Sequence, residues 1–353
     1  MTIGWFKSGF RSKAMFVLAL AVFASACSIE NNENEGTREK SVKESANVTI
    51  AGYSAGGQVS LFGEGVAAMV RAQYPGSNAI YEPGNPAGSL EMLRNKKRAL
   101  AFESLIEVKL ALEGAPPFNR PFTKDGLTSV VNAIPEGSAL LIYARKDFLE
   151  KYGVRSFEDL VNKKVPVRLS INQPGNLWAR AQIDEVFKAY GAKPSDVEKW
   201  GGELVAQVTS TSHDLMRDGR LDMIITGGGV PSASVAELGH SIALAFVPLS
   251  AKAAKEVADA FGGKVKPVPA GTYAFQKEDL QYVVFTDMGI VAGPAATNDQ
   301  TYMVAKAMHQ QLERYQRLHP GLKNVTAEKL PHFGSLKLHP GAEAYYREAG
   351  LIP

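Results

Sequence analysis

The chain has 353 residues, of which 45% are hydrophobic and 21% charged, and its formal net charge is +3. This is the composition of a globular protein with enough chain for two domains, so extensive disorder is excluded. Three positive residues, Lys7, Arg11 and Lys13, lie in the first 26 residues, which contain no acidic residue. The remainder is formally neutral, which argues against nucleic acid as a partner.

Residues 1–26 have the pattern of a secretory signal. A basic segment precedes the apolar run from Ala14 to Ala26, which is too short to span a bilayer comfortably as a permanent helix. The run ends in Ala24-Ser-Ala-Cys27, which is similar to a bacterial lipobox although Ala24 stands where leucine is more usual, and Cys27 is the only cysteine. A lone structural or reactive thiol is the alternative. We expect an exported protein without disulfides, held to a bacterial membrane by a lipid with palmitate-type chains on Cys27 and facing the periplasm or the exterior.

Residues 27–46 are rich in Asn, Glu, Ser and Lys, which predicts a flexible tether. The segment Val48–Gly65 then has the pattern of a strand, a glycine turn and the start of a helix. Its glycines permit a tight turn, and the following helix start offers free N–H groups and the positive end of a dipole. This turn predicts a binding position for a carboxylate or a phosphate.

The same turn, Gly52-Tyr-Ser54-Ala-Gly56, also satisfies the G-x-S-x-G nucleophile elbow of α/β-hydrolases. An elbow serine needs flanking strands, an upstream oxyanion loop, and an acid and a histidine in order downstream. Here the turn follows the first strand after the leader, and no loop of the His-Gly-Gly type precedes it. We therefore favour a ligand-binding turn without a catalytic residue, and a serine esterase using Ser54 is the alternative.

Apolar periodicity predicts two similar α/β units in the chain. The first comprises a strand from Val48, a helix at 58–73, a strand at 78–82, a helix at 87–97 and a strand at 99–102. The second comprises strands at 165–171, 204–208 and 222–226 and helices at 177–190 and 212–218. Two β-rich runs, 128–133 and 139–144, are expected to cross between the lobes.

The C-terminal part is expected to return to the first lobe, through strands at 242–247, 282–285 and 289–292 and helices at 251–261 and 298–318. We therefore predict two α/β lobes, one formed by 47–135 with 245–353 and the other by 136–244. In such a fold the strand-end turns of the lobes face each other across a cleft, and the crossing segments form a hinge suited to closure over a ligand.

Several segments, taken in order, carry a family resemblance. They are Ser54-Ala-Gly-Gly with Gly63, Gly84–Leu93, 154–160, Pro174-Gly175, Asp222 through Gly229, 269–273, His319-Pro320 and the closing run 338–352. Over residues 47–353 the chain resembles the TAXI-family solute-binding subunits of tripartite ATP-independent periplasmic (TRAP) transporters. The resemblance implies a type II periplasmic-binding-protein fold that captures a small solute, often an acidic one such as glutamate or another carboxylate, and delivers it to a membrane permease.

By position, the resemblance also implies a ligand shell drawn from both lobes. Its members would be Ser54, Gly57, Gln58, Asn85, Ser104, Asn172, Gly175, Asn176, Trp178, Thr209, Gly228 and Tyr273. Gln58-Val-Ser60 departs from the usual Thr-Tyr-Tyr continuation, and Leu177 and Trp178 replace hydroxyl or glycine positions. These departures narrow the expected pocket and add apolar surface.

Some of these residues have a structural alternative. The polar residues of the first turn can simply cap the helix that follows. Trp178 can pack against Phe187 within its lobe, and the glycines at 227–229 can serve as a flexible turn. Arg145 can pair with a ligand carboxylate or with Asp147 nearby. The six histidines form no i, i+4 pair with a third ligand, so we expect no metal and no cofactor.

Taken together, the sequence predicts an exported, lipid-anchored binding protein rather than an enzyme. Its expected partners are a small organic solute, such as a carboxylate or an amino acid, and the membrane subunits of a TRAP permease. The two alternatives are the serine esterase and an orphan ligand-sensing lipoprotein that presents the liganded fold to a signalling partner.

Overall fold

The computed structural model describes residues 45–53, 58–84, 89–123 and 125–353. The predicted signal, Cys27, and the candidate ligand residues Ser54, Gly57 and Asn85 lie outside these ranges. Each helix within them is too short or too polar to span a lipid bilayer.

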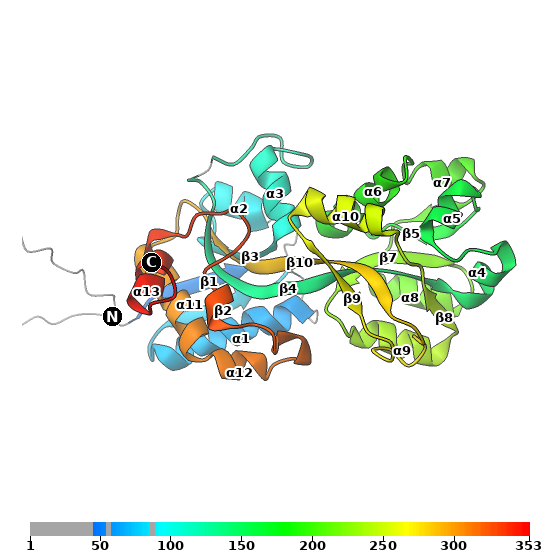
Figure 1. Cartoon of the computed structure of the whole chain (residues 1–353). Helices are drawn as coiled ribbons and strands as arrows, with labels where there is room; N and C mark the ends of the chain where they lie inside the picture. The colour runs from blue at the N-terminus through cyan, green and yellow to red at the C-terminus, as the bar shows by residue number, and fades with distance from the viewer. Residues whose placement is uncertain (1–44, 54–57, 85–88, 124) are drawn as a thin grey trace, which may run out of the picture. The chain divides into compact units, whose positions relative to one another are not determined.

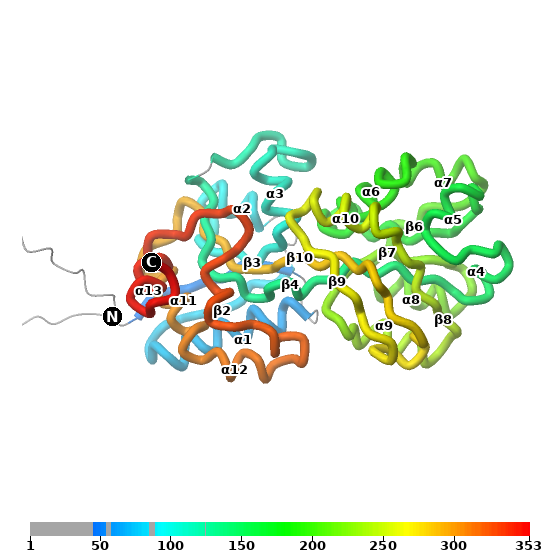
Figure 2. Tube along the Cα trace, in the orientation of Figure 1, coloured from blue at the N-terminus to red at the C-terminus, as the bar shows by residue number. Residues whose placement is uncertain are grey.

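One sheet path runs through the fold, in the order β2-β1-β3-β10-β4-β7-β5-β6, and β8 and β9 pair with β4 and β10 (Figures 1 and 2). At one end β1 is parallel to β2 and β3, and at the other β5 is parallel to β6 and β7. The long strands β4 and β10 are antiparallel to each other and join the two ends. The strands are β1 (Asn47–Ala51), β2 (Asn78–Glu82), β3 (Leu100–Ser104), β4 (Thr128–Arg145), β5 (Arg168–Ser170), β6 (Glu203–Val205), β7 (Met223–Gly228), β8 (Leu244–Phe246), β9 (Lys264–Val268) and β10 (Leu280–Ala292).

Helices cover both faces of the β1–β3 end, which we call the first lobe. Side chains alternate along β1, so that Val48 and Ile50 join one apolar cluster and Ala51 joins another. The cluster around Val48 is completed by α1 (Gln58–Gln73), α11 (Asn298–Gln310), α12 (Leu312–Gln316) and α13 (Pro340–Glu348). The cluster around Ala51 is completed by α2 (Ser89–Arg94) and α3 (Leu105–Glu113).

The β5–β7 end, the second lobe, follows the same physical rule. Met223 and Ile225 of β7 lie in one apolar cluster and Ile224 in another. The first of these clusters includes residues of α4 (Lys146–Tyr152), α5 (Phe157–Asn162), α6 (Leu177–Ala189), α7 (Asp196–Lys199) and α10 (Ala251–Phe261). The second includes residues of α8 (Thr209–Arg217) and α9 (Ala233–Ser241). Because α10 packs here before β10 carries the chain to the first lobe, residues 245–353 contribute to both ends, and the lobe boundaries stay a prediction.

The connection between the lobes differs from the prediction. The runs 128–133 and 139–144 belong to one strand, β4, which continues through Pro135-Glu136-Gly137. Glu136 has a φ of +52°, its N–H donates to the Asp287 carboxylate at 2.7 Å, and its own carboxylate pairs with Lys264 and Lys266. A segment with the composition of a turn is thus held inside the sheet by side chains from β9 and β10, where register shifts occur between β4 and β10.

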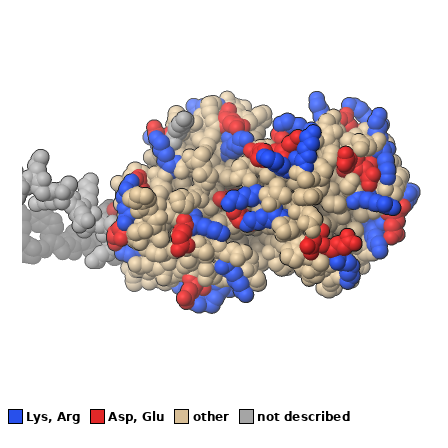
Figure 3. Space-filling model, in the orientation of Figure 1, with Lys and Arg blue, Asp and Glu red and all other residues tan. Residues whose placement is uncertain are grey.

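The predicted helix at 298–318 is two helices. α11 ends at Gln310 and α12 starts at Leu312, with Gln311 outside helical geometry at φ −115° and ψ 28°. Two short 3₁₀ helices, η1 (Pro320–Leu322) and η2 (Ala327–Lys329), follow. The face of the molecule in Figure 3 carries Lys and Arg interspersed with Asp and Glu.

Candidate functional site

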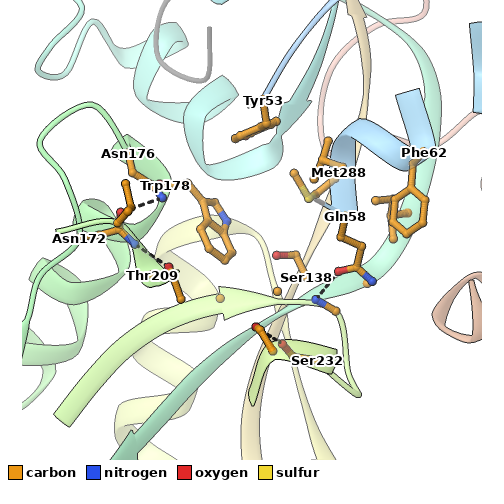
Figure 4. Close-up of a pocket in the computed structure, with 18 of the residues that line it drawn as sticks. Tyr53, Gln58, Phe62, Ser138, Asn172, Asn176, Trp178, Thr209, Ser232 and Met288 are labelled. Carbon is orange, nitrogen blue, oxygen red and sulfur yellow. Dashed lines mark hydrogen bonds between the residues drawn. The ribbon is translucent and has the colours of Figure 1, made fainter. Parts of the chain in front are cut away.

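A pocket of about 480 Å³ lies between the two lobes (Figure 4). The first lobe contributes residues from the end of β1 and the start of α1, β4 and β10 contribute from the connection, and the loops after β5, β6 and β7 contribute from the second lobe. The described lining consists of Tyr53, Gln58, Val59, Phe62, Ile134, Gly137, Ser138, Asn172, Gln173, Asn176, Trp178, Val208, Thr209, Ser210, Gly227, Gly228, Gly229, Ser232, Ser234 and Met288.

None of these described lining residues is charged at neutral pH. Amide, hydroxyl, indole and glycine backbone groups supply the polar surface, and Val59, Phe62, Ile134, Val208 and Met288 supply apolar surface. The described lining thus offers neutral hydrogen-bonding groups and apolar surface.

Four helices begin at the pocket. Gln58 is the first residue of α1, Asn176 is the N-cap of α6, Thr209 is the first residue of α8, and Ser232 is the N-cap of α9. None of the four has an acidic residue in its first turn. Every other α-helix in the described ranges except α10 has one. Because helix starts carry partial positive charge, the pocket lies where the helices lack an acid of their own.

The start of α8 has no side-chain cap. Its N-cap, Val208, has no side chain able to accept from the first-turn N–H groups. Thr209 Oγ1 accepts a hydrogen bond from Asn172 Nδ2 at 3.2 Å, which leaves the Thr209 hydroxyl proton able to donate. The first turn of α8 therefore offers the pocket both backbone and side-chain donors.

The loop before α6 is held by its own amides. Asn172, with φ +59°, accepts from Gln173 N–H at 2.9 Å and from Asn176 Nδ2 at 3.3 Å. Asn176 Oδ1 in turn accepts from Ala179 N–H at 3.0 Å and caps α6. These contacts fix the orientation of both asparagines, so the polar wall of the second lobe is formed before any ligand binds.

Gln58 connects the two lobes at the edge of the pocket. Its Oε1 accepts from the N–H of Gly229 at 3.0 Å, and its Nε2 lies 3.2 and 3.3 Å from the two ring nitrogens of His319. His319 Nδ1 accepts from Gly321 N–H at 3.0 Å, and burial lowers the pKa of His319. A neutral His319 therefore helps to orient an amide that bridges α1 and the end of β7.

Behind the first-lobe wall lies a buried acidic pair. The Tyr53 hydroxyl donates to Glu107, Ser104 Oγ donates to Glu107 Oε2 at 3.0 Å, and Glu107 N–H donates back to Ser104 Oγ at 3.3 Å. Glu103 and Glu107 are fully buried. Burial, with the neighbouring carboxyl, raises the pKa of Glu103 well above its usual range, and burial raises the pKa of Glu107 to about 7. The pair thus holds at least one proton at neutral pH and positions Tyr53.

The residues predicted from the sequence fall into three groups. Those in the described lining are Gln58, Asn172, Asn176, Trp178, Thr209 and Gly228. Those outside the described ranges are Ser54, Gly57 and Asn85. Those described but outside the lining are Ser104, Gly175 and Tyr273.

The third group has other contacts. Ser104 is fully buried and caps α3, and the Tyr273 hydroxyl accepts from Ser232 N–H at 2.8 Å. Arg145 pairs with Asp147 at 2.6 Å, which matches the structural alternative. The ligand role of every one of these residues stays a prediction.

Sequence reasoning missed several lining residues, chiefly Tyr53, Ser138, Ser232, Ser234 and Met288. Tyr53, Ser232 and Ser234 lie next to the glycine turns at 52–57 and 227–229, so their position beside those turns was an available signal. Ser138 and Met288 lie within β4 and β10, and only the crossing of these strands brings them to the pocket.

Solved structures show what class of fold surrounds this pocket. PhnD1 from Prochlorococcus marinus (MIT 9301), determined in complex with methylphosphonate, is 10% identical with a TM-score of 0.50, over 87% of this chain and 99% of that chain. MatC (Rpa3494) from Rhodopseudomonas palustris, with bound malate, is 14% identical with a TM-score of 0.49, over 78% and 88%. The periplasmic aliphatic sulphonate-binding protein SsuA from Escherichia coli is 14% identical with a TM-score of 0.43, over 87% and 84%.

The likeness to PhnD1 is one of fold. The fold is that of the periplasmic solute-binding proteins, so the predicted two-lobed, type II periplasmic-binding-protein-like fold is confirmed. The chain belongs to the NMT1-like family, whose model matches residues 50–350.

Proposed function

We propose that this protein is an exported, lipid-anchored solute-binding protein of the TAXI type, which captures a small carboxylate-bearing solute between its lobes and delivers it to a TRAP-type permease without a chemical step. The observation that carries the proposal is the set of four helix starts at the pocket, none with an acid of its own. A carboxylate from the solute would supply the missing negative charge.

A carboxylate suits this lining although it contains no Lys or Arg among its described residues. Helix N-termini and neutral donors can hold an anion, because several N–H and O–H dipoles directed at one oxygen pair replace its hydration shell. The apolar side chains beside them would cover the carbon skeleton of the solute. Closure of the lobes, with Gln58 bridging to Gly229, would then exclude water.

The esterase alternative finds less support in this lining. A serine nucleophile needs a histidine base and an acid beside it, and the described lining contains no His, Asp or Glu. The two readings separate experimentally: an esterase predicts labelling by an organophosphonate probe that disappears in Ser54→Ala. We expect no labelling of the wild-type protein.

A thermal-shift screen of the purified chain against carboxylates, amino acids and sugars tests the binding function. A specific ligand stabilises the folded state by mass action, by about 2.7 kcal/mol at one hundred times Kd. We expect a rise in Tm with at least one carboxylate and none with neutral sugars. Stabilisation by sugars alone would show that the solute class is wrong.

Anchoring and delivery have separate tests. Cys27→Ser should move the protein from the membrane fraction to the soluble fraction, and a variant that stays as firmly bound as wild type would disprove the anchor. Deletion of the permease subunits should abolish uptake of the same solute as deletion of this protein does. A phenotype that persists without the permease would favour the sensor alternative.

A further inference from the structure

We infer that the indole N–H of Trp178 is a specificity-determining donor, which hydrogen-bonds an oxygen of the bound solute while Gly227 fixes the ring. This inference deepens the proposed function and rests on it. It names the chemical group that the solute must present to the second-lobe wall, which the helix starts alone do not specify.

Trp178 combines burial with an unmet hydrogen-bonding need. It lines the pocket and is only 8% exposed, and its Nε1–H has no hydrogen-bond partner among the residues that the structure describes. Buried polar groups are normally paired, because a buried N–H without a partner has lost its hydrogen bond to water and gained none in the protein. An acceptor supplied by the solute would remove this cost only in the complex.

The position of the ring is fixed by its neighbour on β7. A β-carbon added at Gly227 would overlap three carbon atoms on the benzene side of the Trp178 indole. The ring therefore lies directly against the backbone of Gly227, which only a glycine at this position permits. Figure 4 shows the indole projecting into the pocket from the start of α6, between Asn176 and Tyr53. A donor held in this way loses little conformational entropy when it binds.

The chemistry of the group restricts the solute. An indole N–H can only donate, so its partner must be an acceptor such as a carboxylate, carbonyl or hydroxyl oxygen, and an ammonium group is excluded there. Trp178 is the second residue of α6, whose first turn contains no acid. A carboxylate oxygen would thus receive the indole N–H beside the positive end of the α6 dipole.

The test compares Trp178→Phe with Trp200→Phe in the full chain, using pyruvate, succinate, glutamate and benzoate as probes. Trp200 stacks on Phe187 outside the described lining and is the matched control. For the tightest-binding probe we expect Trp178→Phe to raise Kd about tenfold or more, since hydrogen bonds to charged groups are the stronger ones. Trp200→Phe should change Kd less than twofold.

Two further measurements keep the inference testable if Trp178→Phe folds poorly. The full chain has three tryptophans, so the indole N–H signal that persists in the double variant Trp5→Phe/Trp200→Phe belongs to Trp178. In ¹⁵N spectra this signal should move downfield at saturation with the probe. Gly227→Ala, which displaces the ring and keeps the N–H, should also weaken binding.

The outcomes separate this inference from the function it rests on. If the wild-type protein binds a probe and neither Trp178→Phe nor the indole signal responds, the donor role is wrong and the binding function stands. If no carboxylate binds the wild-type protein, the proposed solute class is wrong and the inference falls with it.

Discussion

Two helices in this protein have a hydroxyl residue at their start, but the surroundings of the two hydroxyls differ. α3 starts after Ser104 and α8 starts at Thr209, and both hydroxyl residues were predicted to contact ligand. At α3 the chain supplies its own acceptor, because Glu107 lies in the first turn and accepts from Ser104 and from Tyr53. At α8 the first turn has no acid and no side-chain cap, and it faces the pocket.

The difference teaches how a hydroxyl at a helix start is to be interpreted. A residue such as Ser104 is not free to bind a ligand, because its hydroxyl is already hydrogen-bonded to an acid three positions later. A residue such as Thr209, whose neighbours leave the helix N–H groups without an anion, is available to a ligand. The predictions that follow alter one start to resemble the other.

The largest effect is expected from removing the acid at the start of α3. Glu107→Ala should lower the free energy of unfolding by about 2–3 kcal/mol, because the hydroxyls of Tyr53 and Ser104 lose their buried acceptor. Urea denaturation measures the change. Glu107→Gln keeps an acceptor of nearly the same size and should lose clearly less. Equal losses in the two variants would show that the hydrogen bonds are not what Glu107 contributes.

The second largest effect is expected from adding an acid at the start of α8. Thr209→Asp puts a carboxylate where the solute carboxylate is proposed to bind, and repulsion together with occupation of the donors should raise Kd by at least tenfold. Ser195→Asp, an exposed position at the start of α7 outside the described lining, is the control and should leave Kd within about twofold. Tm should change little in either variant. Unchanged binding in Thr209→Asp would mean that α8 does not hold the ligand.

Sequence analysis succeeded where local pattern decides the structure. The predicted helices at 58–73 and 251–261 match α1 and α10, and the predicted strand at 78–82 matches β2. In each of these elements the apolar spacing coincides with a change of composition at both ends. The signal and the tether are equally local features, but they lie outside the described residues.

It failed where the deciding partner is distant in the chain. Pro135-Glu136-Gly137 has the composition of a turn, and it stays inside β4 because Asp287, 151 residues later, binds the Glu136 N–H. Ser104 is different, because its partner Glu107 lies only three residues later, and this Ser-x-x-Glu spacing was a local signal for a capped helix start. The contact between Glu107 and Tyr53, 54 residues earlier, is recorded by no local pattern.

A smaller effect is expected at the third helix start, where Gln58 already has partners. Gln58→Ala removes one neutral hydrogen bond between the lobes, to Gly229, and should weaken binding about fivefold without a comparable loss of stability. Gln73→Ala, at the opposite end of α1 and outside the described lining, is the control. Isothermal titration of a bound carboxylate measures both. Equal Kd values in the two variants would exclude a role for this bridge in closure.

The smallest effect is a dependence of stability on pH, which we expect for the start of α3, where Glu107 titrates, and not for the start of α8. Burial raises the pKa of Glu107 to about 7, so the folded protein retains a proton that the unfolded chain releases near the ordinary glutamate value. The folded state therefore binds more protons between about pH 4 and 7, and its free energy of unfolding falls as pH rises through that window. Histidines with lowered pKa values, such as His213 and His319, act in the opposite direction, so total stability is a poor measure.

The difference between wild type and Glu107→Gln cancels the histidine contributions. When pH is raised from 5 to 8, we expect the unfolding free energy of wild type to fall more than that of Glu107→Gln. Both proteins retain the pH dependence that comes from buried Glu103. The first turn of α8 has no acidic group, so the increase in Kd caused by Thr209→Val should not vary over the same range. If the unfolding free energies of wild type and Glu107→Gln had the same dependence on pH, Glu107 would be ionised in the folded protein. The start of α3 would then be stabilised by a charge rather than by a shared proton.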